Sequence, residues 1–288
     1  MEVKGEFKPF MEVAIEEARQ SLREGNHGLG AVILKDNTIL AQAHDKEETD
    51  GDPTSHAELN AIRMACSRTG KDLSGTVLLS THEPCSMCVG AILQARIPHI
   101  VYGYGDAVLQ GRDRNELSDG EFFPKGRLLV EKGPLQKECS VLYNQAVRRE
   151  LNRLRGATDE RLGEYNRMLA ARRIEWYCEE GRKLIPGKGD ATEQGYQLLL
   201  KKLGTTEAEA PVVHRGRGRI VFHSKNFCPT LEACIILGLD TRRTCRLYNE
   251  GATDRLIRQI DPRLRFNRNY NNIRPYSEYC EERIEYDQ

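Results

Sequence analysis

The alternation of apolar and polar positions predicts an α/β pattern over the first half of the chain. Apolar periodicity near 3.6 residues predicts helices at 9–24, 57–69 and 85–96, and a further helix that begins at about residue 136. Short apolar runs predict strands at 75–81, 99–104 and 127–131, and residues 35–38 are typical of a hairpin turn. Helices that alternate with strands indicate a sheet covered by helices.

The pattern changes in the second half of the chain. Charged helical segments begin at about Leu151, residues 186–190 interrupt them, and a short helix is expected near 193–203. One strand is predicted at 219–223. A chain of 288 residues is long enough for about two domains of ordinary size. We therefore expect a first domain at 1–155 and an appended, mostly helical domain at 156–288.

Two short motifs in the first half carry metal-binding chemistry. One is His56-Ala57-Glu58, which follows a turn and opens a helix, and the other is Pro84-Cys85-Ser86-Met87-Cys88. The spacing of the two cysteines places both sulfurs on one face of a helix. Imidazole and thiolate are ligands that tetrahedral Zn²⁺ prefers, and three protein ligands leave the fourth position open to water. The motifs therefore predict a catalytic zinc site formed by His56, Cys85 and Cys88.

Glu58 is the predicted catalytic residue. Two thiolates and one neutral imidazole leave the zinc site about neutral, so the attacking water needs a base. Glu58 lies two residues from His56 and can take this proton, deliver it to a ring nitrogen, and then protonate the departing amine. The products are a carbonyl compound and ammonia.

Each motif also has a simpler interpretation. Ser55 and Glu58 have the spacing of a capping box, in which Glu58 would only cap a helix. A single Cys-x-x-Cys pair also occurs in redox proteins and in structural zinc sites. A structural site requires a fourth ligand, and His82, three residues before Cys85, could supply one.

The motifs together resemble the cytidine deaminase superfamily, in its guanine deaminase and tRNA adenosine deaminase branch. The resemblance spans roughly residues 5–155 and rests on three segments, 30–33, 52–58 and 83–92. It implies a three-layer α/β/α sandwich around a five-stranded mixed sheet, with zinc at the helix ends. It also implies a homodimer.

Three residues are predicted to bind the substrate: Asp45, Ala57 and Asp113. Many relatives carry an asparagine eleven residues before the ligand histidine, and this position is Asp45 here. An ionised aspartate only accepts hydrogen bonds, which favours a guanine-like or triazine-like edge that presents N–H groups. Alternatively, Asp45 is an exposed carboxylate of the acidic run 45–52. Asp113 is one of the acidic residues in the segment 105–123, with Asp106, Glu116 and Asp119, that could bind exocyclic nitrogens.

Composition indicates a cytoplasmic protein. The chain has 43 Lys and Arg residues against 43 Asp and Glu residues. It has no apolar run near the length of about 20 residues that a membrane-spanning helix requires, and its first residues lack the pattern of a signal peptide. Nine cysteines are an odd number, which fits free thiols in a reducing compartment.

Two features of the second half have alternative interpretations. Four residues there, His223, Cys228, Cys234 and Cys245, could bind a second metal, but their spacing fits buried thiols better. Residues 211–274 contain thirteen basic against five acidic residues, with aromatic residues interleaved, and could bind RNA. Alternatively, these arginines pair with the acidic residues that follow, Glu278, Glu281, Glu282, Glu285 and Asp287.

The sequence therefore predicts a zinc-dependent hydrolytic deaminase of a purine or pyrimidine base or nucleoside, with guanine as the favoured substrate. The alternative is a tRNA adenosine-to-inosine deaminase whose second domain binds the RNA. A third possibility is a sensor that binds a ligand without turning it over. Glu58 argues against the sensor, because a sensor does not need a proton shuttle.

Overall fold

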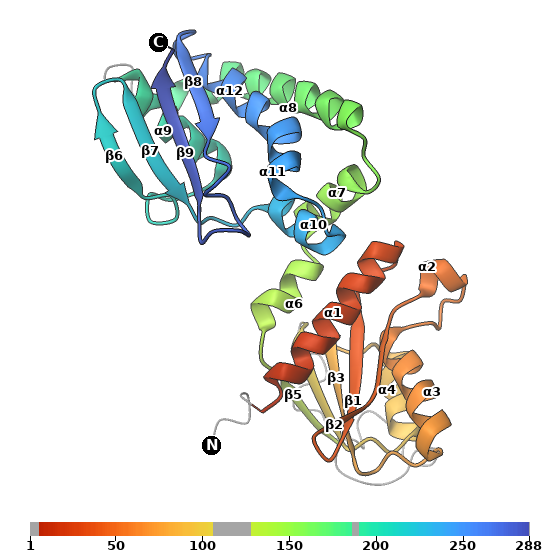
Figure 1. Cartoon of the computed structure of the whole chain (residues 1–288). Helices are drawn as coiled ribbons and strands as arrows, with labels where there is room; N and C mark the ends of the chain where they lie inside the picture. The colour runs from red at the N-terminus through yellow and green to blue at the C-terminus, as the bar shows by residue number, and fades with distance from the viewer. Residues whose placement is uncertain (1–5, 106–127, 186–189, 288) are drawn as a thin grey trace. The chain divides into compact units, whose positions relative to one another are not determined.

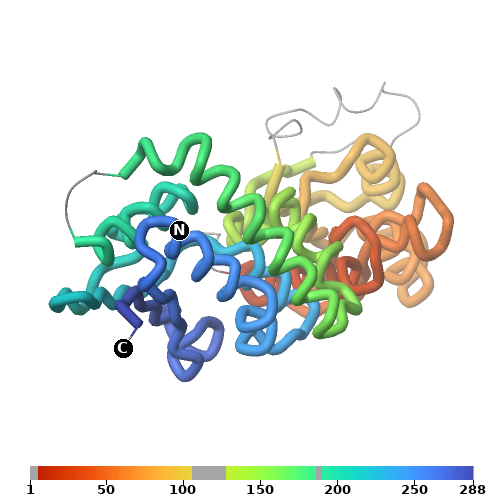
Figure 2. Tube along the Cα trace, turned by 90° about the horizontal axis from the view of Figure 1, so that it is seen from above, coloured from red at the N-terminus to blue at the C-terminus, as the bar shows by residue number. Residues whose placement is uncertain are grey.

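The chain folds into two compact units, residues 1–148 and 149–288, which run from red to green and from green to blue in Figures 1 and 2. The computed structural model describes residues 6–105, 128–185 and 190–287. Each unit has its own sheet and its own apolar core. No helix among the described residues is both long and apolar enough to cross a membrane.

The first unit contains a five-stranded mixed sheet, as predicted. Its strand order is β2-β1-β3-β4-β5, where β1 is antiparallel to both β2 and β3, and β3, β4 and β5 are parallel. The strands are β1 (Gly30–Lys35), β2 (Thr38–His44), β3 (Thr76–His82), β4 (His99–Tyr104) and β5 (Leu129–Lys132). Because β3 and β4 are parallel, both end at the same edge of the sheet, and β3 leads there into the segment that carries Cys85.

Helices cover both faces of this sheet and complete the predicted three-layer sandwich (Figure 1). Ala31 and Ile33 of β1 face a core shared with α3 and α4, whereas Val32 and Leu34 face a core shared with α1 and α6. Among the described residues, the helices of this unit are α1 (Lys8–Glu24), α2 (Glu47–Asp50), α3 (Ala57–Thr69), α4 (Ser86–Gln94) and α6 (Gln136–Leu142). A further helix, α7 (Gln145–Leu154), spans the unit boundary. Gly30 allows the close approach of α1, since a Cβ there would lie 2.0 Å from the carbonyl oxygen of Ala14.

The elements of the first unit lie within a few residues of their predicted positions. The helix predicted at 57–69 has these bounds, and the strand predicted at 99–104 is β4. Met64 of α3 is 37% exposed. The smaller side chains Ala61 and Ala65 make up much of the buried face of α3.

The second unit combines helices with a second sheet. Its four strands are all antiparallel, in the order β6-β7-β9-β8, and the strand predicted at 219–223 is β7. The strands are β6 (Val212–Gly216), β7 (Arg219–Ser224), β8 (Leu264–Arg268) and β9 (Cys280–Tyr286). The helices are α8 (Asp159–Glu179), η1 (Gly181–Lys183), α9 (Ala191–Leu203), α10 (Pro229–Leu237), α11 (Thr241–Thr244), the π-helical segment η2 (Cys245–Glu250) and α12 (Gly251–Ile257).

A histidine between two glutamates makes the stability of the first unit depend on pH. His44 of β2 lies 2.6 Å (Nδ1) from Glu17 and 3.0 Å (Nε2) from Glu24. The hydrogen bond with Glu17 raises the pKa of His44 above its usual value of 6.5. The stabilisation by protonated His44 is therefore fully present below about pH 6.5 and is lost as the pH rises through the higher pKa of the folded state.

We expect His44→Gln to lower the free energy of unfolding by about 1–2 kcal/mol at pH 6 and by less at pH 8.5. Urea unfolding followed by circular dichroism at both pH values measures this difference. An equal loss at both values would show that the imidazole charge does not stabilise the fold.

Candidate active site

The structure brings the three predicted zinc ligands together. Nδ1 of His56 lies 3.6 Å from Sγ of Cys85 and 3.5 Å from Sγ of Cys88. His56 is the N-cap of α3, Cys85 is the N-cap of α4, and Cys88 lies in the first turn of α4. Their potential ligand atoms all lie within 4.8 Å of one another. One imidazole nitrogen and two sulfurs at this separation suit a zinc ion that keeps one open position.

The environment of the two sulfurs also fits a bound cation. Cys85 is exposed, whereas Cys88 is fully buried. Burial raises the pKa of the Cys88 thiol, and the nearby carboxylate of Glu58 raises it further. A bound divalent cation acts in the opposite direction and favours the thiolate.

Glu58 lies beside the ligand cluster and does not cap a helix. Its side chain is 2% exposed, its Oε1 accepts a hydrogen bond from Oγ of Ser80 at 2.9 Å, and its Oε2 lies 3.4 Å from Sγ of Cys88. The capping box is not formed, because α3 begins after His56 and the hydroxyl of Ser55 donates to Asp50. Glu58 is therefore held with one oxygen against β3 and the other on the side of the sulfurs.

Neither alternative metal ligand set is formed among the described residues. His82 lies outside the cluster, and its ring packs 4.6 Å from the ring of Tyr143, which itself stacks on Tyr104 at 5.6 Å. In the second unit, the set of His223, Cys228, Cys234 and Cys245 does not come together as a metal site in the part of the chain that the structure describes. Cys234 and Cys245 are buried, which agrees with the interpretation as core thiols.

Two of the three predicted substrate-binding residues lie at the cluster. Ala57 is fully buried at the start of α3, between His56 and Glu58. Asp45 is also fully buried; its Oδ1 accepts a hydrogen bond from the backbone N–H of His27 at 3.1 Å, and its Oδ2 is buried without a hydrogen-bond partner among the described residues. Asp45 is therefore not an exposed loop carboxylate. Asp113 lies outside the described residues.

The structure adds residues that sequence reasoning missed. Glu47 lies 3.7 Å from Nε2 of His56 and 3.4 Å from Nε2 of His27, and Glu48 lies 3.6 Å from the same atom of His27. A carboxylate near the second nitrogen of a metal-binding histidine helps to orient the ring. Ser80, which donates a hydrogen bond to Glu58, is a fully buried polar residue that directly follows the apolar run at 77–79 of β3, and its place after that run was the available signal in the sequence.

Known proteins match the part of the chain that carries this site. Residues 6–104 match the family described as the cytidine and deoxycytidylate deaminase zinc-binding region. A tRNA-specific adenosine deaminase of Streptococcus pyogenes serotype M18 is 37% identical over 142 residues, which are 48% of this chain and 88% of that protein. The chain belongs to the cytidine deaminase superfamily. It is a zinc-dependent enzyme that hydrolyses a C–N bond and releases ammonia.

Other members of the superfamily match a similar share of the chain. The tRNA-specific adenosine deaminase of Bacillus subtilis strain 168 is 34% identical over 158 residues, which are 54% of this chain and 96% of that protein. A solved structure from studies of A-to-I editing by tRNA:A34 deaminases is 33% identical and covers 46% of this chain and 98% of its own, with a TM-score of 0.41. A guanine deaminase structure from Bacillus subtilis is 32% identical and covers 42% of this chain and 84% of its own, with a TM-score of 0.33.

Proposed function

We propose that this protein converts adenosine to inosine in RNA, with release of ammonia. The observation that carries the proposal is the agreement among relatives. The Streptococcus pyogenes and Bacillus subtilis proteins are named tRNA-specific adenosine deaminases, and this chain aligns with 88% and 96% of their lengths. Guanine, the substrate that the sequence analysis favoured, has no support from these relatives.

The residues of the site have distinct roles in the proposed reaction. His56, Cys85 and Cys88 would hold zinc, which when bound supplies Lewis-acid activation of water. Glu58 takes a proton from the attacking water through Oε2, while the hydrogen bond from Ser80 fixes Oε1. As the C–O bond forms at the amidine carbon, Glu58 delivers the proton to the ring nitrogen. Glu58 then takes the proton of the new hydroxyl group and gives it to the amine, the C–N bond breaks, ammonia leaves and the carbonyl forms.

RNA binding by the second unit stays a prediction, and so does the homodimer. Part of the basic excess of residues 211–274 is compensated within the unit, since Arg219 pairs with Glu285, Arg265 with Asp287 and Arg268 with Glu282. These pairs support the interpretation that the basic and acidic segments neutralise each other. If the second unit nevertheless binds RNA, the affinity should fall steeply with salt, because each neutralised phosphate releases counterions.

Asp45 favours a second candidate function, the deamination of a small free heterocycle. Its buried Oδ2 has no hydrogen-bond partner among the described residues and is free to accept one, and its carboxylate lies within 4.8 Å of the potential ligand atoms of Glu47 and His56. An acceptor at this point favours a ring that presents an N–H group. The acidic residues Glu47 and Glu48 nearby are unfavourable for an approaching phosphate.

One assay distinguishes the two functions. Zinc-loaded protein is incubated with a tRNA anticodon stem-loop, and separately with adenine, guanine, cytosine, triazines and the nucleosides; ammonia is measured in all cases and inosine in the RNA. Inosine in the stem-loop with no ammonia from the free compounds supports RNA editing. Ammonia from free compounds alone would contradict the RNA proposal and support the second function.

Asp45→Asn tests the role of this residue in substrate choice. An asparagine side chain also donates, so the variant should gain activity toward rings that present an acceptor; its neutral oxygen accepts more weakly than a carboxylate, so it should lose part of the activity toward rings that present N–H. We expect the ratio of kcat/KM values between the two kinds of ring to change by about 10-fold or more, since an unpaired buried polar group costs about 1–3 kcal/mol. An unchanged ratio in a folded, zinc-loaded variant would show that Asp45 does not contact the base.

A further inference from the structure

The strands of the second sheet carry a buried polar network that the deaminase reaction does not use. Glu282 of β9 lies at its centre and is 6% exposed. Its Oε2 accepts a hydrogen bond from Oγ of Ser224 on β7 at 2.6 Å, and its Oε1 accepts one from Nε of Arg268 on β8 at 2.7 Å. One buried carboxylate on β9 thus joins this central strand to the other central strand, β7, and to the edge strand β8.

The network continues from the sheet into the helices above it. Nη2 of Arg268 donates to Oδ1 of Asn249 in η2 at 3.3 Å, and the hydroxyl of Thr253 in α12 donates to the same oxygen at 3.1 Å. Thr253 in turn accepts a hydrogen bond from Nη1 of Arg173 in α8 at 2.6 Å. A chain of hydrogen bonds therefore connects two guanidinium groups through buried polar side chains.

Positive charge exceeds negative charge in this network. Arg173 is 8% exposed and the side chain of Arg268 is 12% exposed, and among the described residues Glu282 is the only carboxylate hydrogen-bonded to either of them. Burial, together with the charge of Arg268, lowers the pKa of Arg173 to about 10, so both groups stay charged at neutral pH. Buried charges are stable only when they are paired, so a second anion would compensate this excess.

Buried guanidinium nitrogens in the described part of this unit also lack a hydrogen-bond acceptor, which agrees with a missing anion. Nη1 of Arg268 is buried and has no acceptor among the described residues, and the same holds for Nε of Arg274. Both arginines lie within electrostatic range of Cys228, but burial raises the pKa of this thiol. Cys228 therefore stays neutral at pH 7 and does not supply the missing negative charge.

We propose that this network is a binding site for the oxyanion group of a small ligand, a carboxylate or a phosphate, with Arg268 as the main hydrogen-bond donor and Arg173 as the second positive charge. Guanidinium groups match the geometry of both oxyanions and bind them most strongly where water is excluded. The proposal concerns the second unit alone and does not depend on the substrate of the deaminase site.

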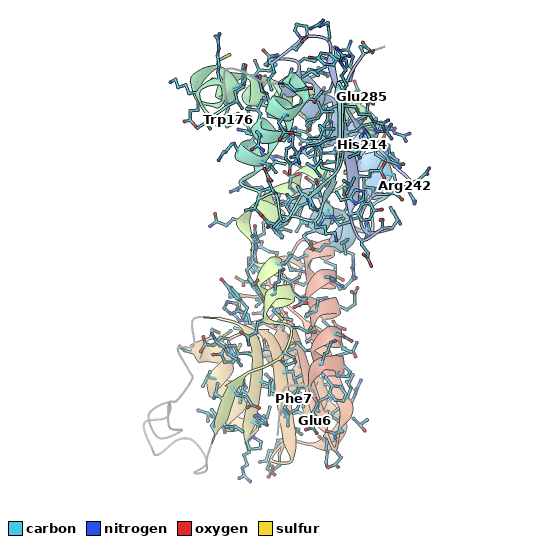
Figure 3. The ribbon with its side chains drawn as sticks, turned by 90° about the vertical axis from the view of Figure 1, so that its left-hand side faces the viewer. Glu6, Phe7, Trp176, His214, Arg242 and Glu285 are labelled. Atoms are coloured by element: carbon cyan, nitrogen blue, oxygen red, sulfur yellow. The ribbon has the colours of Figure 1, made fainter. Side chains whose placement is uncertain are left out.

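The chain contains a natural reporter for this site. Trp176 is its single tryptophan and lies on α8, three residues from Arg173 (Figure 3). Its fluorescence therefore follows unfolding of the second unit in the full-length protein. The midpoint of thermal unfolding is measured in sodium phosphate, in sodium acetate and in sodium chloride at equal ionic strength and pH. At a hundredfold excess over Kd, the midpoint should rise by roughly 5–10 °C relative to chloride.

The two oxyanions separate the possible ligand groups. A rise in phosphate alone assigns the site to a phosphoryl group, and a rise in acetate assigns it to a carboxylate. Midpoints equal to those in chloride for both anions would overturn the proposal.

Two variants test whether the response comes from this network. Arg268→Lys keeps the charge but loses the unpaired Nη1 donor, so it should lose the response to the anion. Arg173→Met removes the excess charge, so it should lose the response without lowering the midpoint in chloride, whereas a merely structural role would lower that midpoint. Arg172→Met, at the exposed neighbouring position, is the control and should respond like the original protein. A full response in Arg173→Met would overturn the proposal even if Arg268→Lys failed to fold.

Discussion

Replacing Glu58 with glutamine is expected to lower kcat by about 10²–10⁴-fold while the protein keeps its zinc. The amide has nearly the same shape as the carboxylate and can still accept the hydrogen bond from Ser80, but it cannot take a proton. The zinc ligands are untouched, because the metal is held by His56, Cys85 and Cys88. The change therefore removes proton transfer and leaves the architecture of the site in place.

Two measurements on the same sample check this expectation, zinc content by elemental analysis and ammonia release with the substrate found in the panel assay. Ser80→Ala is the matched control, since it removes the hydrogen bond to Oε1 of Glu58 but leaves the carboxylate. It should lower kcat by much less than Glu58→Gln. Near-normal turnover in Glu58→Gln with full zinc content would show that another group transfers the proton.

Much of the first unit could be predicted from the sequence because its elements follow local rules. The helix at 57–69 and the strand at 99–104 have the bounds that periodicity predicted. The zinc ligands were found for the same reason, since His56 and the Cys85–Cys88 pair belong to short motifs with fixed spacing. The resemblance to known deaminases then supplied the three-layer arrangement around a five-stranded mixed sheet, which periodicity alone does not give.

The second unit was harder to predict because polar residues occupy buried positions in it. Strand β9 has the sequence Cys-Glu-Glu-Arg-Ile-Glu-Tyr, in which the buried residues are Glu282 and Ile284. A buried glutamate breaks the alternation that marks a half-buried strand, so the strand was missed. Its burial depends on Ser224 and Arg268, which are distant in sequence and become partners only in the folded sheet.

The same limit applies to parts of the active site. The contact between Ser80 and Glu58 and the approach of Glu47 to His56 join residues of different elements, so no local pattern predicts them. The burial of Asp45 likewise depends on the tertiary fold, and the sequence left it open as an exposed carboxylate.

Replacing Cys85 with alanine is expected to weaken zinc binding by more than about 100-fold. Even the loss of a residue that only hydrogen-bonds to a metal ligand lowers metal affinity by about 10–100-fold. Deaminase activity should fall to the background for the same reason. The fold should persist, because Cys85 is exposed at the N-cap of α4 and its side chain fills no space in the core. Loss of metal without loss of structure is thus the signature of a ligand at this position.

Dialysis against a chelator of known affinity, followed by zinc analysis and circular dichroism, separates the two effects. Cys178→Ala is the control, because Cys178 is also exposed but lies on α8 of the second unit and is not one of the three clustered ligands, so the variant should keep a full equivalent of zinc. Cys88→Ala should lose zinc and also destabilise the fold by about 1–2 kcal/mol, since Cys88 is fully buried. If Cys85→Ala retained tightly bound zinc, the metal would be held by a different set of ligands. The role of Glu58 as the base beside the metal would then have to be abandoned as well.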